Sequence, residues 1–186
     1  MKRDAIISAC GKYRYALWRI WDDNRPLVMF LCLNPSTADA VNDDRTIGRC
    51  ISFAQSWRYG GLSVGNLFAL RATKREDLWQ SNDPIGTEND QWLRELRDKA
   101  QVVIAAWGDD GGFQDRDRAA VTMFPALHCL KLSAKGNPRH PLYLSGNLKP
   151  VKFSEQYHQD CGPVLLGASM SPNFSASASA TPSTPY

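Results

Sequence analysis

Hydrophobic residues gather in several short runs, each followed by polar or turn-forming residues. These runs cover residues 27–33, 62–68, 102–108 and 127–132. Runs of this length without alternation are typical of strands that are buried on both faces. Segment 13–21 alternates instead and is rich in aromatic residues, which predicts an edge strand that forms a hairpin with 27–33.

Between these runs the apolar residues change to a helical period. Ile47, Cys50, Ile51, Ala54 and Trp57 fall on one face of a helix of about three turns. This predicted helix is flanked by residues suited to its ends, since Asp44 is placed to cap its start and Gly60-Gly61 to end it. Two short helical patterns occupy residues 74–99, and residues 116–124 predict a further helix. Strands that alternate with helices predict an α/β fold, here three α/β/α layers around a mostly parallel four-stranded sheet.

Length and composition indicate one globular domain. The chain has 186 residues, of which 43% are hydrophobic and 22% charged, and this is ordinary for a folded protein with a single core. We expect that domain to span residues 1–160. Residues 161–186 carry no charged side chain and are low in complexity, which predicts a disordered tail.

Charge and cysteine usage narrow the function class only slightly. A formal charge of +3 permits a nucleic-acid partner without requiring one, and the six Trp and six Tyr residues supply rings for a core or for stacking on bases. The five cysteines include no CxxC pair, so we interpret them as reduced, buried thiols of a cytoplasmic protein. We expect no membrane span, no metal and no cofactor, and a monomer.

The candidate chemistry lies where the predicted parallel strands end. Asn34, Asn66, Trp107-Gly108 and His140 each follow or lie beyond one of these strands. Ligands in open α/β sheets bind outside the carboxyl ends of the strands, so we expect these residues to meet at one site.

The same segments carry a resemblance to a known family. Leu33-Asn34-Pro35-Ser36, Gly65-Asn66, Trp107-Gly108 and Arg139-His140-Pro141-Leu142-Tyr143-Leu144 follow one another in the order of motifs of the uracil-DNA glycosylase superfamily. A wider pattern over residues 13–153, including Asn34-Pro35-Ser36-Thr37-Ala38-Asp39, also resembles an uncharacterised bacterial domain family. The first resemblance implies a uracil-DNA glycosylase-like fold and an enzyme that flips a base out of DNA and hydrolyses its N-glycosidic bond.

The resemblance assigns a role to each motif residue. Asn34 and His140 are the expected catalytic residues, with Asn34 holding the attacking water and His140 donating to the departing base. The expected base-binding residues are Pro35, Ser36, Asn66 and Phe68, with Phe53 as another stacking candidate. The expected DNA contacts are Arg139 for a phosphate and Tyr143 and Leu144 as wedges in the stack.

This chain departs from the superfamily pattern at four positions. Ser36 replaces a glycine, Leu142 a phosphate-contacting serine and Tyr143 a proline, and Asn34 stands where the fastest branch has an aspartate. These departures leave a base other than plain uracil open as the substrate. Two other functions also stay open. The replaced glycine and serine fit a nucleic-acid-binding or nucleotide-binding module without activity, and the weak overall charge fits a hydrolase of free nucleosides or nucleotides.

Structural roles remain open for the same residues. Asn34 is also a common turn residue before proline, and Asn66 can cap a strand end. Phe53 and Phe68 equally suit a core, and His140 an ordinary surface loop. Asp39, Asp43 and Asp44 suit either a metal site or the capping of backbone amides.

Overall fold

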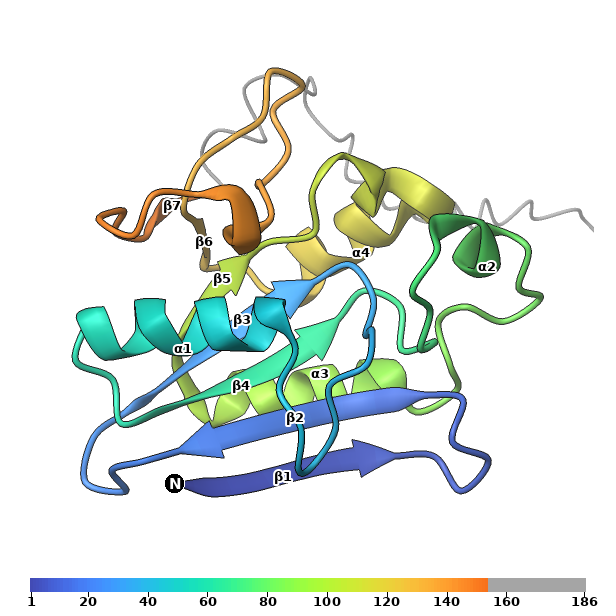
Figure 1. Cartoon of the computed structure of the whole chain (residues 1–186). Helices are drawn as coiled ribbons and strands as arrows, with labels where there is room; N and C mark the ends of the chain where they lie inside the picture. The colour runs from blue at the N-terminus through green and yellow to red at the C-terminus, as the bar shows by residue number, and fades with distance from the viewer. Residues whose placement is uncertain (154–186) are drawn as a thin grey trace, which may run out of the picture.

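A computed structural model describes residues 1–153, which form a mixed α/β fold around a seven-stranded sheet (Figure 1). The strands lie in the order β1-β2-β4-β3-β5-β6-β7. Their bounds are β1 Lys2–Ile7, β2 Arg14–Ile20, β3 Leu27–Cys32, β4 Gly61–Asn66, β5 Ala100–Ala105, β6 Leu127–Cys129 and β7 Val151–Lys152. The helices are α1 Arg45–Ser56, α2 Arg75–Trp79, α3 Asn89–Asp98 and α4 Arg116–Met123, with 3₁₀ turns η1 Asp109–Asp115 and η2 Pro141–Tyr143. The predicted tail, residues 161–186, lies outside the described residues.

The four apolar runs form the parallel part of the sheet, as predicted. Strand β3 pairs in parallel with both β4 and β5, and β5 pairs in parallel with β6. The prediction of a four-stranded sheet is wrong, because β1, β2 and β7 extend it with antiparallel pairings. Parallel strands run in one direction, so the loops after β3, β4, β5 and β6 leave from one edge of the sheet.

Helices cover both faces of this sheet, so the side chains of each central strand are buried on both sides. One core cluster joins Val28 and Phe30 of β3 to Ile47 and Phe53 of α1. The opposite cluster joins Met29 of the same strand to the helices α3 and α4, as Figure 1 shows in outline. Continuous apolar runs are required because alternate residues of each strand enter different cores.

The helix α1 begins as expected and ends differently. Asp44 accepts a hydrogen bond from the backbone N–H of Ile47 (2.9 Å), which confirms its capping role. The chain then turns at Arg58, whose φ is +66°, rather than at the glycines. Gly60 is needed for a different reason, because a Cβ there would lie 2.0 Å from the backbone oxygen of Asp22.

Strand β2 does not pair with β3, and the predicted hairpin is therefore wrong. It lies between β1 and β4 instead, antiparallel to both. Its Arg19 is fully buried and pairs with Asp43 (2.7 Å), and it also donates to the backbone oxygens of Asp39 (2.6 Å) and Asn42 (3.3 Å). Arg19 thereby ties the loop before α1 to the sheet.

Two other expectations concern the state of the cysteines and a metal site at the acidic residues. Cys32, Cys50 and Cys129 are buried free thiols as expected, but Cys10 is exposed in the turn after β1. The backbone N–H groups of Val41 and Asn42 donate to Asp39, so that carboxylate serves the loop rather than a metal. Within residues 1–153, no group of three metal-ligating side chains occurs, and no helix has the length and apolarity that crossing a membrane requires.

Candidate functional site

One small polar pocket lies at the carboxyl edge of the parallel strands. It brings together residues from the loops after β3 and β6, the end of β4, the start of α1 and strand β2. The residues that line it are Arg14, Cys32, Asn34, Ser36, Asp44, Thr46, Ile47, Val64, Asn66 and His140. Asn34, Asn66, Trp107-Gly108 and His140 were expected to meet at one site because they follow successive strands. The structure brings Asn34, Asn66 and His140 together in this pocket, whereas Trp107-Gly108 does not line it.

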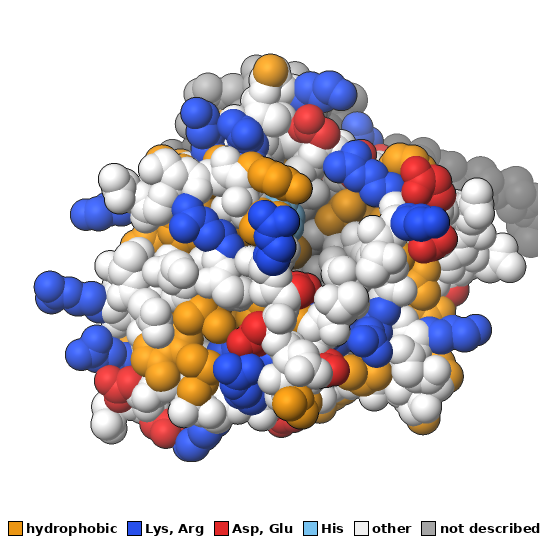
Figure 2. Space-filling model, viewed as in Figure 1, with side chains coloured by type: hydrophobic (Ala, Val, Ile, Leu, Met, Phe, Trp, Pro, Cys, Tyr) orange, Lys and Arg blue, Asp and Glu red, His pale blue; other side chains and the backbone are white. Residues whose placement is uncertain are grey.

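The pocket is small. Its volume is about 40 Å³, or about 300 Å³ when the open space around it is included. The smaller volume corresponds to roughly three water molecules, at about 10–15 Å³ each. Figure 2 shows a hollow near the middle of this face of the molecule, with Lys and Arg side chains around it. The pocket therefore has room for the polar edge of a ligand, and the rest of a larger ligand would lie outside it.

Asn34 is held so that its oxygen is the free end of the amide. Its Nδ2 donates to the backbone oxygens of Pro35 (3.1 Å) and Ala72 (2.8 Å). The N–H of Ala72 returns a bond to the oxygen of Pro35 (3.0 Å), so the loops after β3 and β4 lock together. Both amide hydrogens are used, which leaves Oδ1 as an acceptor suited to holding a water molecule. Pro35 is buried and shapes this turn without lining the pocket.

Asn66 is oriented in the opposite sense. The side chain is only 2% exposed, and its Oδ1 accepts a hydrogen bond from Arg14 (3.2 Å). No acceptor for its Nδ2 occurs within residues 1–153, so the amide presents a donor to the pocket. Asn34 and Asn66 thus offer unlike groups, an acceptor and a donor.

His140 is fixed in one tautomer by its own loop. Its Nδ1 accepts a hydrogen bond from the backbone N–H of Leu142 (3.3 Å), which places the proton of the neutral ring on Nε2. Burial lowers the pKa of His140 from its ordinary value, against an opposing effect of Asp44. The ring is therefore neutral at pH 7 and offers Nε2–H as a donor.

This lowered pKa makes folding stability sensitive to acid. The unfolded chain protonates His140 near its ordinary pKa of about 6.5, whereas the fold resists that proton. The unfolded state then binds more protons as the pH falls below this value, so stability that is present at pH 7.5 decreases toward pH 5. We expect the His140→Gln variant to lose less stability than the wild type over this range in urea unfolding. Equal losses in the two proteins would contradict the assignment.

The loop that carries His140 is anchored on α1. Arg49 donates to the backbone oxygen of Leu144, and Trp57 Nε1 donates to the backbone oxygen of Leu148 (3.0 Å). Leu144 itself is 7% exposed and packs in the core between the sheet and α1. The expectation that Leu144 acts as a wedge is therefore wrong for this conformation, because its side chain is already buried. Tyr143, at 75% exposed, is the apolar side chain that faces outward.

Replacing Leu144 and Tyr143 with alanine should show which of the two side chains stabilises the core. We expect Leu144→Ala to lower the free energy of unfolding by about 2–3 kcal/mol, because it leaves a cavity in the core. Tyr143→Ala is the matched control, and it should change stability by less than about 0.5 kcal/mol. Urea unfolding measures both, and a Leu144→Ala effect as small as that of Tyr143→Ala would show that Leu144 is not an anchor.

Four other predicted residues, Phe68, Phe53, Trp107 and Arg139, do not line the pocket. Phe68 is fully buried in the opposite core, where its ring packs against Phe113 at 5.6 Å, so its predicted contact with a base is wrong. Phe53 is likewise core, 1% exposed and stacked on Trp57. Trp107 is 2% exposed and lies edge-on to Phe153. Arg139 lies one residue from His140, and its backbone N–H donates to the oxygen of Lys131 (2.8 Å).

Arg14 is the charged pocket residue that the sequence patterns did not identify. It is 3% exposed, and it donates to the backbone oxygen of Ala38 (2.9 Å) and to Asn66, while its buried Nε has no partner. Burial lowers the pKa of Arg14 to about 10, against an opposing effect of Asp44. A charged side chain inside a strand flanked by apolar residues is itself a signal, because an unpaired buried ion costs several kcal/mol.

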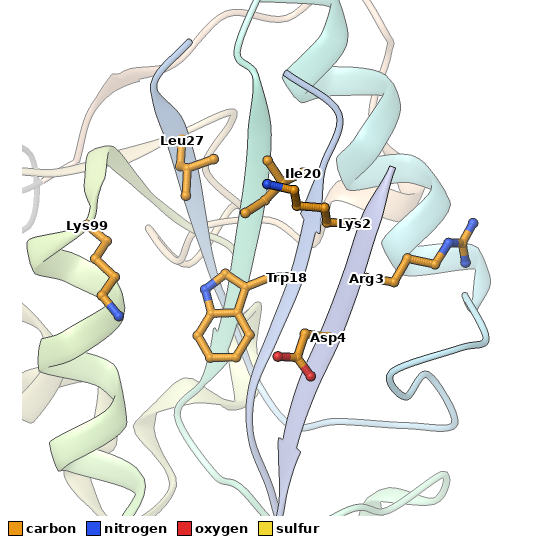
Figure 3. Close-up of a pocket in the computed structure, with 7 residues that line it drawn as sticks. All are labelled: Lys2, Arg3, Asp4, Trp18, Ile20, Leu27 and Lys99. Carbon is orange, nitrogen blue, oxygen red and sulfur yellow. The ribbon is translucent and has the colours of Figure 1, made fainter. Parts of the chain in front are cut away.

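A larger depression lies at the opposite end of the parallel strands (Figure 3). It has a volume of about 410 Å³ and is lined by Lys2, Arg3, Asp4, Trp18, Ile20, Leu27 and Lys99. Two of its four charged side chains, Lys2 and Arg3, are already paired with Asp23 and Asp43. We therefore assign the candidate site to the smaller pocket, whose polar groups converge and remain available.

Comparison with known proteins gives one match. No curated protein and no solved structure matches the chain. Residues 14–142 match the family described as "Protein of unknown function (DUF1643)", and every residue that lines the polar pocket lies within this segment. Because the match covers more than half of its length, the chain belongs to the DUF1643 family.

Proposed function

We propose that this protein is a monofunctional DNA glycosylase, which flips a damaged or modified base out of DNA and hydrolyses its N-glycosidic bond. The observation that carries the proposal is the meeting of Asn34, Asn66 and His140 in one pocket, with an acceptor and two donors free. We propose in addition that the four parallel strands correspond to a uracil-DNA glycosylase-like core.

Hydrolysis of this bond needs stabilisation of two opposite charges. The C1′–N bond breaks with its electron pair moving to the base, and the oxygen of a water molecule bonds to C1′. The water loses a proton, and the base anion gains one. Asn34 Oδ1 accepts a hydrogen bond from the water and positions it, since a dissociative reaction needs orientation more than deprotonation. His140 Nε2–H donates to an oxygen of the base as negative charge grows there.

The remaining roles in the proposal concern recognition of the flipped nucleotide. Asn66 Nδ2 reads a carbonyl at the inner edge of the base, with Ser36 beside it. Tyr143 fills the gap in the stack, because it is the exposed apolar side chain of the His140 loop. Arg139 meets a phosphate. The protein acts in this proposal as a monomer on DNA, without a metal or cofactor.

The test is a panel of substrates. Purified protein is incubated with DNA that carries uracil, oxidised, deaminated, hydroxymethylated or glucosylated bases, and abasic sites are scored. Free nucleosides form a separate arm, because a nucleoside hydrolase would prefer them. We expect product from at least one modified DNA, and salt-dependent DNA binding without product from any DNA or nucleoside would indicate a binding module instead.

A further inference from the structure

Among the described residues, Arg14 differs from the other buried arginines in having no carboxylate partner. Arg19 pairs with Asp43 at 2.7 Å, and Arg116 pairs with Asp90 at 2.6 Å. Arg14 is buried to a similar extent, but it donates only to the backbone oxygen of Ala38 and the amide oxygen of Asn66. These contacts use two of the five N–H bonds of the guanidinium. A buried arginine that lines a pocket and has no carboxylate within hydrogen-bond distance is suited to an anionic ligand.

The groups around Arg14 reinforce this preference. Asn66 presents Nδ2–H because Arg14 occupies its oxygen, and His140 presents Nε2–H because Leu142 occupies its Nδ1. Thr46 and Ile47 of the first turn of α1 also line the pocket, where the helix dipole favours negative charge. The carboxylate of Asp44 is engaged with the N–H of Ile47. The pocket is therefore rich in donors, and the positive charge of Arg14 lies among them, opposed only by the more distant carboxylate of Asp44.

We propose that Arg14 is a further catalytic residue, which binds the departing base as an anion and makes the pocket specific for bases that place a carbonyl oxygen, rather than an amino group, against Arg14 and Asn66. This inference rests on the proposed function. When the glycosidic bond breaks, the electron pair left on the ring nitrogen spreads onto the carbonyl oxygens of a keto base. Arg14 and His140 meet that charge inside the protein, where such donors act most strongly.

The proposal also defines which bases are excluded. An amino group at the inserted edge would place its N–H bonds against the donors of Arg14 and Asn66. Two donors cannot satisfy each other, and a polar group left unpaired in a buried site weakens binding by about 5- to 150-fold. Bases of the keto class are therefore accepted, and bases that insert an amino group are rejected.

The experiment measures binding of free bases to the full-length protein, so it requires neither DNA nor turnover. Uracil is the keto probe, cytosine is the amino probe, and inorganic phosphate represents a small anion of another kind. Affinities are obtained from ligand-dependent thermal unfolding of the wild type, Arg14→Gln, Arg14→Lys and Arg118→Gln. Arg118 is the matched control, since it is exposed on α4 and distant in sequence from every pocket residue.

We expect the wild type and Arg118→Gln to bind uracil at least about tenfold more tightly than cytosine. Arg14→Gln should weaken uracil binding by about 10- to 100-fold, the effect expected from the loss of a charged hydrogen-bond donor. Arg14→Lys should restore part of it, because it returns the charge without the planar set of donors. Unchanged uracil affinity in Arg14→Gln, equal affinity for cytosine, or binding of phosphate alone would each overturn the proposal.

A second measurement uses the wild type alone, so its result does not depend on whether a variant folds. Uracil loses a proton as the pH rises, so its affinity should increase as the free base ionises if the pocket binds an anion. A flat or falling profile would overturn the proposal. The results also distinguish failure of this inference from failure of the proposed function. If the protein binds uracil but releases no base from any DNA, the glycosylase function is wrong and the anion site stands. If Arg14→Gln forms abasic product as fast as the wild type, the glycosylase function stands and the role of Arg14 is wrong.

Discussion

Replacing His140 with alanine is expected to slow base release by about 10²- to 10³-fold, the effect of losing one preorganised donor to a developing anion. The expectation follows from the fixed tautomer, since Nδ1 accepts from Leu142 and Nε2–H is then the only donor of the neutral ring. Because this interaction strengthens in the transition state, the loss should fall on kcat more than on KM. Single-turnover kinetics on the best DNA substrate measures it.

The control for this variant is His128, the other histidine among residues 1–153. His128 lies on β6 with its Nδ1 near the backbone oxygen of Ala126 (3.2 Å), and it does not line the pocket. His128→Ala should cleave at the wild-type rate. If His140→Ala also cleaves at that rate, His140 does not stabilise the leaving base.

Replacing Asp43 with alanine is expected to lower the free energy of unfolding by about 3 kcal/mol. Asp43 is the counter-charge of Arg19, whose side chain is fully buried, and removing one partner of a buried ion pair typically costs about 3–5 kcal/mol. The lower end applies here, because Asp43 is partly exposed and the backbone oxygens of Asp39 and Asn42 still accept from Arg19. The loss is large against a typical total stability of about 5–15 kcal/mol.

An exposed ion pair provides the comparison for Asp43. Lys2 and Asp23 lie 2.8 Å apart, but both side chains are mostly exposed, so Asp23→Ala should cost less than about 1 kcal/mol. Urea unfolding of both variants gives the two values. An Asp43→Ala effect as small as that of Asp23→Ala would show that Arg19 does not depend on its carboxylate.

The parallel part of the fold was predictable because its side chains carry the signal directly. Val28 and Phe30 enter one core while Met29 enters the other, so a strand buried on both faces requires an unbroken apolar run. Strand β1 was missed because Lys2, Arg3 and Asp4 are exposed at the edge of the sheet, where no apolar run is needed. The pairing of β2 with β4 could not be read from chain order, since β2 is followed directly along the chain by β3.

The candidate site was predictable to the extent that it depends on strand ends. Asn34, Asn66 and His140 meet because parallel strands deliver their loops to one edge. Phe68 and Leu144 were misassigned because an apolar side chain suits a core as well as a base, and only packing distinguishes the two. Arg14 was missed because the role of a strand arginine depends on whether a carboxylate faces it, which is a property of the tertiary structure.

The most direct test of the central claim follows a single oxygen atom. The reaction is run in H₂¹⁸O on modified DNA, and the released base and the abasic sugar are analysed by mass spectrometry. We expect an intact free base without label, because the ¹⁸O enters the sugar at C1′, the carbon that water attacks while Asn34 holds it. Label in the base, or no released base from any DNA in the panel, would contradict the account.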